Sequence, residues 1–204
     1  NTVNIMNTPF QKYHHGNLRD EILKAAYNFV KENGYAAMSL RGIAEQCNVS
    51  ATAIYRHYKT KEHLLADVVV KGFEEFTICI EGDGGADIFN KCENYLSFAF
   101  DNKNIYDLLF SQSVVEFLKF PNILEVADDA FKSFLESVKE HDKSLNDLSA
   151  SNKAVHIWSF LHGISSISKK MEIALELPDV EMTVPVRSVK RARENLRQFI
   201  EDLF

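Results

Sequence analysis

The sequence is poor in residues that break regular structure and in residues that form cross-links. Its 204 residues include only 8 glycines and 4 prolines, so we expect few turns and long helices. The 3 cysteines, Cys47, Cys79 and Cys92, are odd in number and do not cluster, which favours buried thiols in a reducing compartment over disulfide bonds or a metal site. No apolar run approaches the ~20 residues that cross a bilayer, and no basic-then-apolar signal peptide is visible. These absences predict a cytoplasmic protein with no membrane span, metal or cofactor.

Acidic residues outnumber basic ones, but the excess is not spread evenly. The formal net charge is −6. Residues 1–64 contain 8 of the 23 Lys and Arg residues, only 5 of the 29 Asp and Glu residues, and four of the 7 histidines. An acidic body repels phosphates, so contact with nucleic acid would be made by this mildly basic head alone. Residues 1–64 are therefore the candidate nucleic-acid-binding part.

The stretch 38–65, MSLRGIAEQCNVSATAIYRHYKTKEHLL, contains three helix starts. Ser39, Ser50 and Thr60 each precede a helical pattern whose free backbone N–H groups a hydroxyl can accept. Asn48 tolerates the positive φ that ends the first helix. Two short helices joined by a tight turn, the second polar-faced, are typical of a helix-turn-helix DNA reader. The apolar wedge expected between these helices consists of Leu40, Ile43, Ala44, Val49 and Ile54.

Four motifs in and before this stretch resemble those of the TetR family of transcriptional regulators. YHHGNLR at 13–19 is similar to the lead into the family's first helix, and SLRGIAE at 39–45 to its second. NVS at 48–50 occupies the turn, and IYRHYKTKE at 54–62 matches the recognition helix and the start of the fourth helix. Gly42 departs from the family pattern, in which an acidic or other helix-favouring residue is more usual at this position. Glycine cannot form a capping box and costs about 1 kcal/mol of local helix stability.

The resemblance implies an all-α fold of about nine helices in two domains. Residues 1–12 are expected to form a flexible arm, residues 13–64 the helix-turn-helix DNA-binding domain with its motif at about 39–58, and residues 65–204 a helical effector-binding and dimerisation domain. Apolar periodicity and helix-stop residues independently place the helices and the breaks between them. The expected helices cover 18–33, 40–47, 51–57, 61–81, 86–100, 104–119 with a possible break near 111–113, 121–141, 147–175 and 186–203, with a loop at 82–85 and a linker at 178–185.

Eleven residues of the motif are candidate DNA contacts. Thr52 and its two flanking alanines are expected to face base edges in the major groove, where the alanine methyls meet thymine methyls. Tyr55, His57 and Lys61 are expected to hold phosphates, together with backbone N–H groups at helix starts. The two arginines can reach either backbone or base. The full candidate set is Ser39, Arg41, Ser50, Ala51, Thr52, Ala53, Tyr55, Arg56, His57, Thr60 and Lys61.

The body offers candidates for an effector pocket. Trp158 and His162 are spaced i,i+4, hence on one helix face, and with Gly163 they are similar to a signature of one large group of TetR C-terminal domains. Two interpretations stay open for them, a pocket for a small molecule and ordinary core packing. Few cationic residues lie on these apolar faces, which weighs against a strongly anionic ligand and favours a largely apolar one. The candidate pocket residues are Cys92, Tyr95, Phe98, Tyr106, Phe110, Phe117, Phe134, Trp158 and His162.

Two apolar seams at helical spacing run along the last two long helices. In the TetR family such helices pair between subunits, so the resemblance implies a homodimer. Burial of both seams within one subunit is the alternative. A single helix-turn-helix rarely supplies the contact area for operator-level affinity, which favours the dimer. The candidate interface residues are Ile157, Leu161, Ile164, Val189, Leu196, Phe199 and Leu203.

These features predict a ligand-responsive regulator, most simply a repressor, that binds double-stranded operator DNA as a homodimer and is released by a small-molecule effector. An effector-independent DNA-binding protein, or an activator, is the alternative of the same fold. An enzyme is disfavoured, because neither Cys47 with His57 nor Glu74-Glu75 with His63 has a plausible pocket around it.

Overall fold

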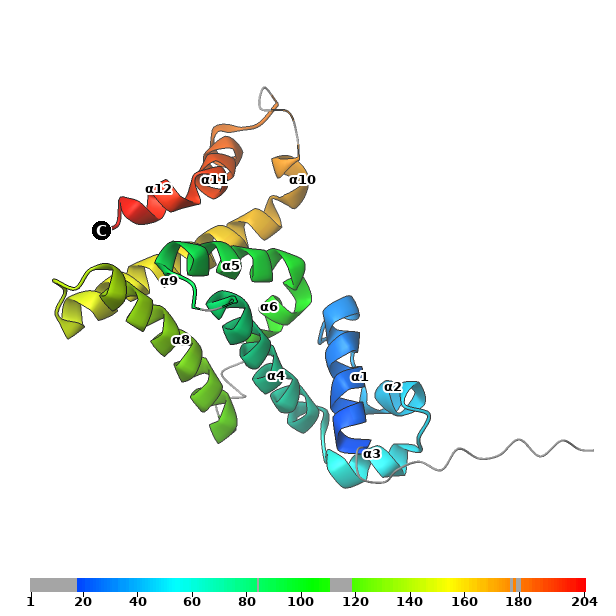
Figure 1. Cartoon of the computed structure of the whole chain (residues 1–204). Coiled ribbons are helices and arrows are strands. Elements are labelled where there is room, and N and C mark those ends of the chain that lie inside the picture. Colours follow the sequence, from blue (N-terminus) through cyan, green and yellow to red (C-terminus); the bar gives the residue numbers. More distant parts are fainter. Residues whose placement is uncertain (1–17, 84, 111–118, 177, 179–180) are drawn as a thin grey trace, which may run out of the picture.

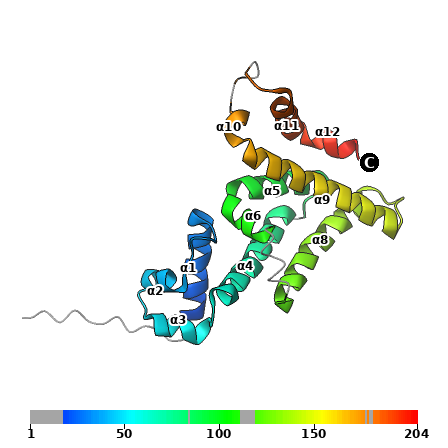
Figure 2. The same cartoon turned by 180° about the vertical axis from the view of Figure 1, so that it is seen from behind.

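Every regular element in the described part of the chain is a helix, as the sequence predicts. The computed structural model describes residues 18–83, 85–110, 119–176, 178 and 181–204 (Figures 1 and 2). The expected arm at 1–12, residues 13–17 of the first domain and the possible helix break at 111–113 lie outside these residues. None of the helices in the described ranges is long and apolar enough to cross a membrane.

The head consists of three helices, α1 (Leu18–Asn33), α2 (Leu40–Gln46) and α3 (Ala51–His57). The Ser39 hydroxyl accepts the N–H of Gly42 at 3.1 Å, and the Ser50 hydroxyl accepts that of Ala53 at 3.2 Å. Asn48 has a φ of 53° and lies in the turn between α2 and α3. The two predicted caps and the predicted turn are therefore confirmed. The apolar wedge is buried except for the half-buried Val49.

Helix α4 (Lys61–Glu81) has the predicted bounds and leads from the head into the body (Figure 1). The expectation that Thr60 caps it through its side chain is wrong. Thr60 occupies the N-cap position, but its hydroxyl makes no capping bond and lies 3.0 Å from Nδ1 of His63. The imidazole is within reach of the hydroxyl because His63 stands in the first turn of α4.

Polar contacts join α1 to α4 along the seam between head and body. Arg19 of α1 pairs with Asp67 of α4 at 2.9 Å, and the Tyr58 hydroxyl donates to the same carboxylate at 2.9 Å. Burial is the largest of the causes that raise the pKa of Tyr58 to about 12, so the phenol stays protonated and able to donate. Further along the seam, Tyr27 donates to Glu75. The head is thus attached to the body by oriented polar groups as well as by apolar packing.

The body contains the remaining helices. These are α5 (Ile88–Asp101), α6 (Lys103–Leu109), α8 (Pro121–His141), α9 (Asp147–Lys170), α10 (Glu172–Leu175), α11 (Val184–Glu194) and α12 (Leu196–Glu201). Helix α9 packs against α5, α8 and α11, and α12 packs against α5. In both views α11 and α12 lie on the side of α9 opposite to α8 (Figures 1 and 2). The periodicity predicted both ends of α8, and it predicted the starts of α5, α6, α9 and α11 to within two residues. The helix expected at 104–119 is wrong in its length, because α6 ends at Leu109.

Two long helices expected from the sequence are each divided in two. The predicted helix 147–175 is interrupted at Met171, and the predicted helix 186–203 at Asn195. The Asn195 amide donates to the carbonyl of Arg191 at 2.8 Å, and such a side-chain bond competes with continued helix. The expected linker at 178–185 is shorter than predicted, because α11 already begins at Val184 and takes Pro185 into its first turn, where proline costs no hydrogen bond.

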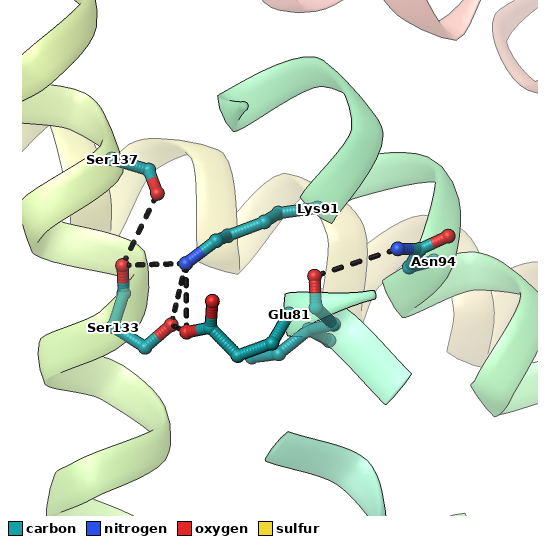
Figure 3. A network of polar contacts seen from close by, with 6 residues as sticks. Glu81, Lys91, Asn94, Ser133 and Ser137 are labelled. Carbon is teal, nitrogen blue, oxygen red and sulfur yellow. Dashed lines mark hydrogen bonds and ion pairs between the residues drawn. The ribbon is translucent and has the colours of Figure 1, made fainter. Parts of the chain in front are cut away.

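A buried ammonium group fixes the body end of α4. Lys91 of α5 is only 4% exposed, and its Nζ donates to Glu81 Oε1 at 2.9 Å and to the hydroxyl and carbonyl oxygens of Ser133 at 2.6 and 3.1 Å (Figure 3). The Ser133 hydroxyl in turn donates to Glu81. Glu81 is the last residue of α4 and Ser133 lies in α8, so one lysine ties three helices together just before the turn at Gly82.

Candidate functional site

The outer face of α3 is exposed and carries no acidic residue. Its sequence is ATAIYRH, of which only Ile54 is buried in the wedge. Thr52, Tyr55, Arg56 and His57 are exposed, and the Tyr55 ring is 54% exposed. A short helix that shows a hydroxyl, a phenol and two basic groups to solvent matches what major-groove readers use for bases and phosphates.

The other candidate DNA contacts surround this face. Ser39, Arg41, Ser50, Ala51 and Thr60 are exposed, and Ala53 is half-buried. The two capping hydroxyls accept backbone N–H groups, but each keeps its own O–H to donate to a phosphate.

Lys61 holds part of the head together. Its side chain is half-buried, and Nζ donates to the carbonyl of Ala36 at 3.1 Å. An ammonium has three donors, so this bond leaves capacity for a phosphate.

Two of the residues considered for catalysis, Cys47 and Glu75, are shaped by their neighbours. Burial, followed by the charge of Glu21, raises the pKa of the Cys47 thiol, which is the opposite of what a thiolate nucleophile needs. Glu75 binds Tyr27 and pairs with Lys71 at 2.7 Å. Among the described residues, no group of three or more His, Cys, Asp or Glu side chains is placed to hold a metal ion.

A cavity of about 830 Å³ lies in the body, with Tyr35 of the head as part of its lining. Its walls come from the turn after α1, the end of α5, helix α6, the second half of α9, α10 and α11. Its lining residues include Tyr35, Phe100, Lys103, Tyr106, Asp107, Phe110, His162, Ser165, Lys169, Lys170, Glu172, Leu175, Glu176 and Arg193. This volume falls in the range of small-molecule sites.

Three polar side chains form a chain of hydrogen bonds from this cavity into the core. The hydroxyls of Tyr95 and Tyr106 are 2.9 Å apart, and the Tyr106 hydroxyl is 2.8 Å from Nδ1 of His162. Burial lowers the pKa of His162 and raises the pKa values of Tyr95 and Tyr106, so these groups favour their uncharged forms at neutral pH. Tyr95 in turn packs edge-on against Phe76 of α4, with ring centroids 5.2 Å apart.

The predicted pocket residues divide into four groups. Tyr106, Phe110 and His162 line the cavity. Cys92, Tyr95, Phe98 and Phe134 are buried core residues, and Trp158 is 38% exposed with its ring against Phe131. Phe117 lies outside the described residues.

Sequence reasoning missed the charged residues of the cavity lining, and its expectation of few cations around the pocket is wrong for this cavity. Lys103, Lys169 and Arg193 belong to three different helices, so no local pattern in the sequence brings them together. Their convergence is a property of the packing of α6, α9 and α11.

The predicted interface residues are also divided. Ile157, Leu161, Ile164 and Leu196 are buried within the single chain, and Val189 is half-buried. Phe199 and Leu203 are 43% and 37% exposed. The Phe199 ring stacks on Phe160 of α9 at 5.6 Å with 10° between the planes. Most of the predicted interface residues therefore pack within one subunit, and only Phe199 and Leu203 are accessible to a second copy.

Three helices with a capped, exposed third helix define the head as a helix-turn-helix domain of the kind that reads DNA. Residues 22–68 match the family model described as "Bacterial regulatory proteins, tetR family". The match covers the head and the start of α4, so the chain contains a DNA-binding domain of the TetR type.

Relatives of known sequence match part of the chain. The HTH-type transcriptional repressor KstR of Rhodococcus jostii is 34% identical over 56 residues, which make up 28% of this chain and 26% of that protein. The match thus spans about a quarter of the relative's length and gives no information about the rest of either protein.

Solved structures match over nearly the whole chain. A protein of unknown function from Rhodococcus sp. RHA1 has a TM-score of 0.69 at 20% identity, covering 94% of this chain and 97% of that one. The regulator FadR of Bacillus subtilis, solved in complex with stearoyl-CoA, has a TM-score of 0.60 at 19% identity, covering 86% and 97%. At these identities the likeness establishes that the body shares the fold, and nothing about its ligand.

Proposed function

We propose that the protein is a ligand-responsive repressor that binds a pseudo-palindromic operator as a homodimer and leaves it when a small effector with a largely apolar body occupies the body domain. The observation that carries the proposal is the exposed, acid-free face of α3. Thr52 lies between two alanines on this face, suited to base edges, and Arg56 and His57 follow at the end of the helix, suited to phosphates.

The geometry of DNA reading supports a homodimer. One α3 face is only seven residues long, and two such faces must lie about one helical turn, roughly 34–36 Å, apart to read two half-sites. The exposed residues Phe199 of α12 and Ile167 of α9 supply apolar surface for a second copy. A division into two domains at about residue 64 is supported by α4, which begins beside α3 and continues into the body.

Effector control is supported by the position of the cavity. It borders both Tyr35 of the head and helices of the body, so a ligand there can favour one head orientation over another. A ligand shifts such an equilibrium only through unequal affinity for the two states. A protein of the same fold binds stearoyl-CoA, which supports an effector role for the body without naming the ligand.

The test begins with an operator selected from random duplexes of about 30 base pairs by repeated binding to the protein. Fluorescence anisotropy then measures affinity for this operator and for a scrambled duplex. We expect Arg56→Gln to weaken operator binding about tenfold, within the ~1–3 kcal/mol that one base or phosphate contact contributes.

Arg191→Gln is the matched control, since Arg191 is exposed on α11 in the body and its loss leaves the affinity unchanged. Failure of the selection to enrich any duplex, or equal effects of the two substitutions, would refute the proposed function.

A further inference from the structure

The charge of the cavity lining differs from that of the body around it. Beyond residue 64 the chain has 15 basic and 24 acidic residues. The cavity lining has four basic residues, Lys103, Lys169, Lys170 and Arg193, against the three acidic residues Asp107, Glu172 and Glu176. A local excess of positive charge within an acidic domain favours an anionic occupant.

A second cavity provides a comparison within the same domain. It measures about 890 Å³, lies between α5 and α11–α12, and shares Phe100, Leu175 and Arg193 with the first. Its charged lining residues are Lys190, Arg193 and Arg197 against Glu93, Asp101, Glu194 and Glu201. The positive excess is therefore specific to the cavity beside the head.

The cations of the first cavity are already positioned by neighbouring groups. Lys103 of α6 pairs with Glu172 of α10, and Lys169 of α9 pairs with Asp107 of α6. The guanidinium of Arg193 lies 4.1 Å from the centroid of the Phe100 ring. A carboxylate can bind Arg193 directly and compete with Asp107 and Glu172 for the two ammonium groups, at little ordering cost to the protein.

Other residues of the cavity lining suit the uncharged part of a ligand. Phe110 and Tyr106 pack with their ring centroids 4.6 Å apart, and Phe110 lies 5.3 Å from His162. Leu175 and Ala99 add aliphatic surface. A lining that combines rings and aliphatic groups with cations suits an amphipathic anion.

We propose that this cavity binds an organic carboxylate with an aromatic or aliphatic body, and that the bound molecule touches the DNA-binding head directly at Tyr35. This inference rests on the proposed function, because it identifies the class of effector and the route of its action. The ligand contacts the head because Tyr35 is part of the lining of the cavity.

Helix α6 provides a second contact between the cavity wall and the head. The Asn104 amide of α6 donates to the carbonyl of Lys31, near the end of α1, at 3.0 Å. Lys103 and Asp107, on the same helix, belong to the cavity lining. A carboxylate that displaces either of their ion pairs therefore acts on the helix that is bonded to α1.

The first experiment is calorimetric titration of the full chain with 2-naphthoate and decanoate, each compared with its primary amide. We expect at least one acid to bind at least fivefold more tightly than its amide. Arg193→Gln should lose at least fivefold in affinity for that acid, whereas Arg191→Gln on the same helix should not. Absence of binding by both acids, equal binding of acid and amide, or equal behaviour of the two arginine variants would overturn the proposal.

The second experiment measures the affinity of the bound acid for the free protein and for its complex with the selected operator. The proposal requires these two affinities to differ at least fivefold. In Asn104→Ala the ratio of the two affinities should move closer to one. The affinity of the free variant for the acid should stay within threefold of that of the free parent protein. Equal affinities in the parent protein would refute direct contact with the head. Operator binding without ligand is recorded separately, so a failed effector hypothesis is distinguishable from a failed regulator hypothesis.

Discussion

At the scale of single residues, the head depends on side chains that complete backbone hydrogen bonds. Helices α2 and α3 have seven residues each, too few to be stable alone in water. The Ser39 and Ser50 caps compensate, each contributing on the order of 1 kcal/mol. The glycine at position 42 also has a local reason, because a Cβ there would lie 3.2 Å from the Ser39 hydroxyl.

Thr52 is the residue on which sequence specificity should depend. Replacing its hydroxyl with a methyl in Thr52→Val keeps the shape and removes one donor and acceptor from the exposed face of α3. We expect the ratio of affinities for the selected operator and for its single-base variants to change about fivefold or more at one base pair, while affinity for scrambled DNA stays the same. Anisotropy across a set of point-substituted duplexes measures this ratio, and a uniform loss on every sequence contradicts a base-reading role.

The sequence predicted the head better than the body, and there is a physical reason for the difference. Caps, turn and wedge in the head are local patterns within a few residues, so Ser39, Asn48 and Ser50 could be assigned in advance. The cavity is made by residues far apart in the chain, such as Tyr35 and Arg193. Which phenylalanines are core and which line a cavity depends on helix packing, which periodicity does not encode.

At the scale of helices, α4 is fixed at both ends by polar groups. Near its start Asp67 binds Arg19 and Tyr58, and at its end Glu81 binds Lys91 and Ser133. Between them Gly72 allows close approach, since a Cβ there would lie 2.9 Å from Leu109 of α6. Helix α4 is held at both ends and packed tightly between them, so it should move as a rigid unit. Such a helix is suited to transmit a displacement from the body to the head.

The Glu81 contact makes a prediction about pH. The hydroxyl of Ser133, followed by the ammonium of Lys91, holds the pKa of Glu81 below its ordinary value. The stability that this carboxylate contributes is therefore complete above the ordinary pKa of about 4.3 and is lost as the pH falls through the lowered value. Because the side chain is 39% exposed, we expect Glu81→Gln to cost only about 1 kcal/mol at pH 7.

Urea unfolding of both proteins from pH 7 to pH 3 tests this expectation. The difference in unfolding free energy between parent and Glu81→Gln should shrink toward zero below the lowered pKa. Glu140→Gln, an exposed glutamate on the same α8 that carries Ser133, is the control and should show no such pH dependence. A difference that stays constant over the whole range argues against the Ser133 and Lys91 contacts as its source.

At the scale of the whole molecule, one outer surface is available for a second copy. Phe160 and Phe199 stack across α9 and α12, and Ile167 is 43% exposed. Gly163 of α9 has nothing within 4 Å of the position its Cβ would occupy. An open glycine beside exposed apolar residues permits close approach of a partner helix, and burial of such apolar surface drives association.

Gly163→Gln tests this surface without disturbing the subunit. Glutamine favours helix over glycine by up to about 1 kcal/mol, and the open space around Gly163 accepts its side chain, so the unfolding temperature of the monomer should not fall. In a dimer that packs at this point, the added side chain would block the approach of the partner helix. We therefore expect the dimer dissociation constant to rise at least tenfold in sedimentation equilibrium, and operator affinity to fall with it. Leu124→Gln, an exposed position on α8, should leave both unchanged. If Gly163→Gln remains as dimeric as the parent protein, the partner binds elsewhere, and the spacing of the two α3 faces must be set by a different surface.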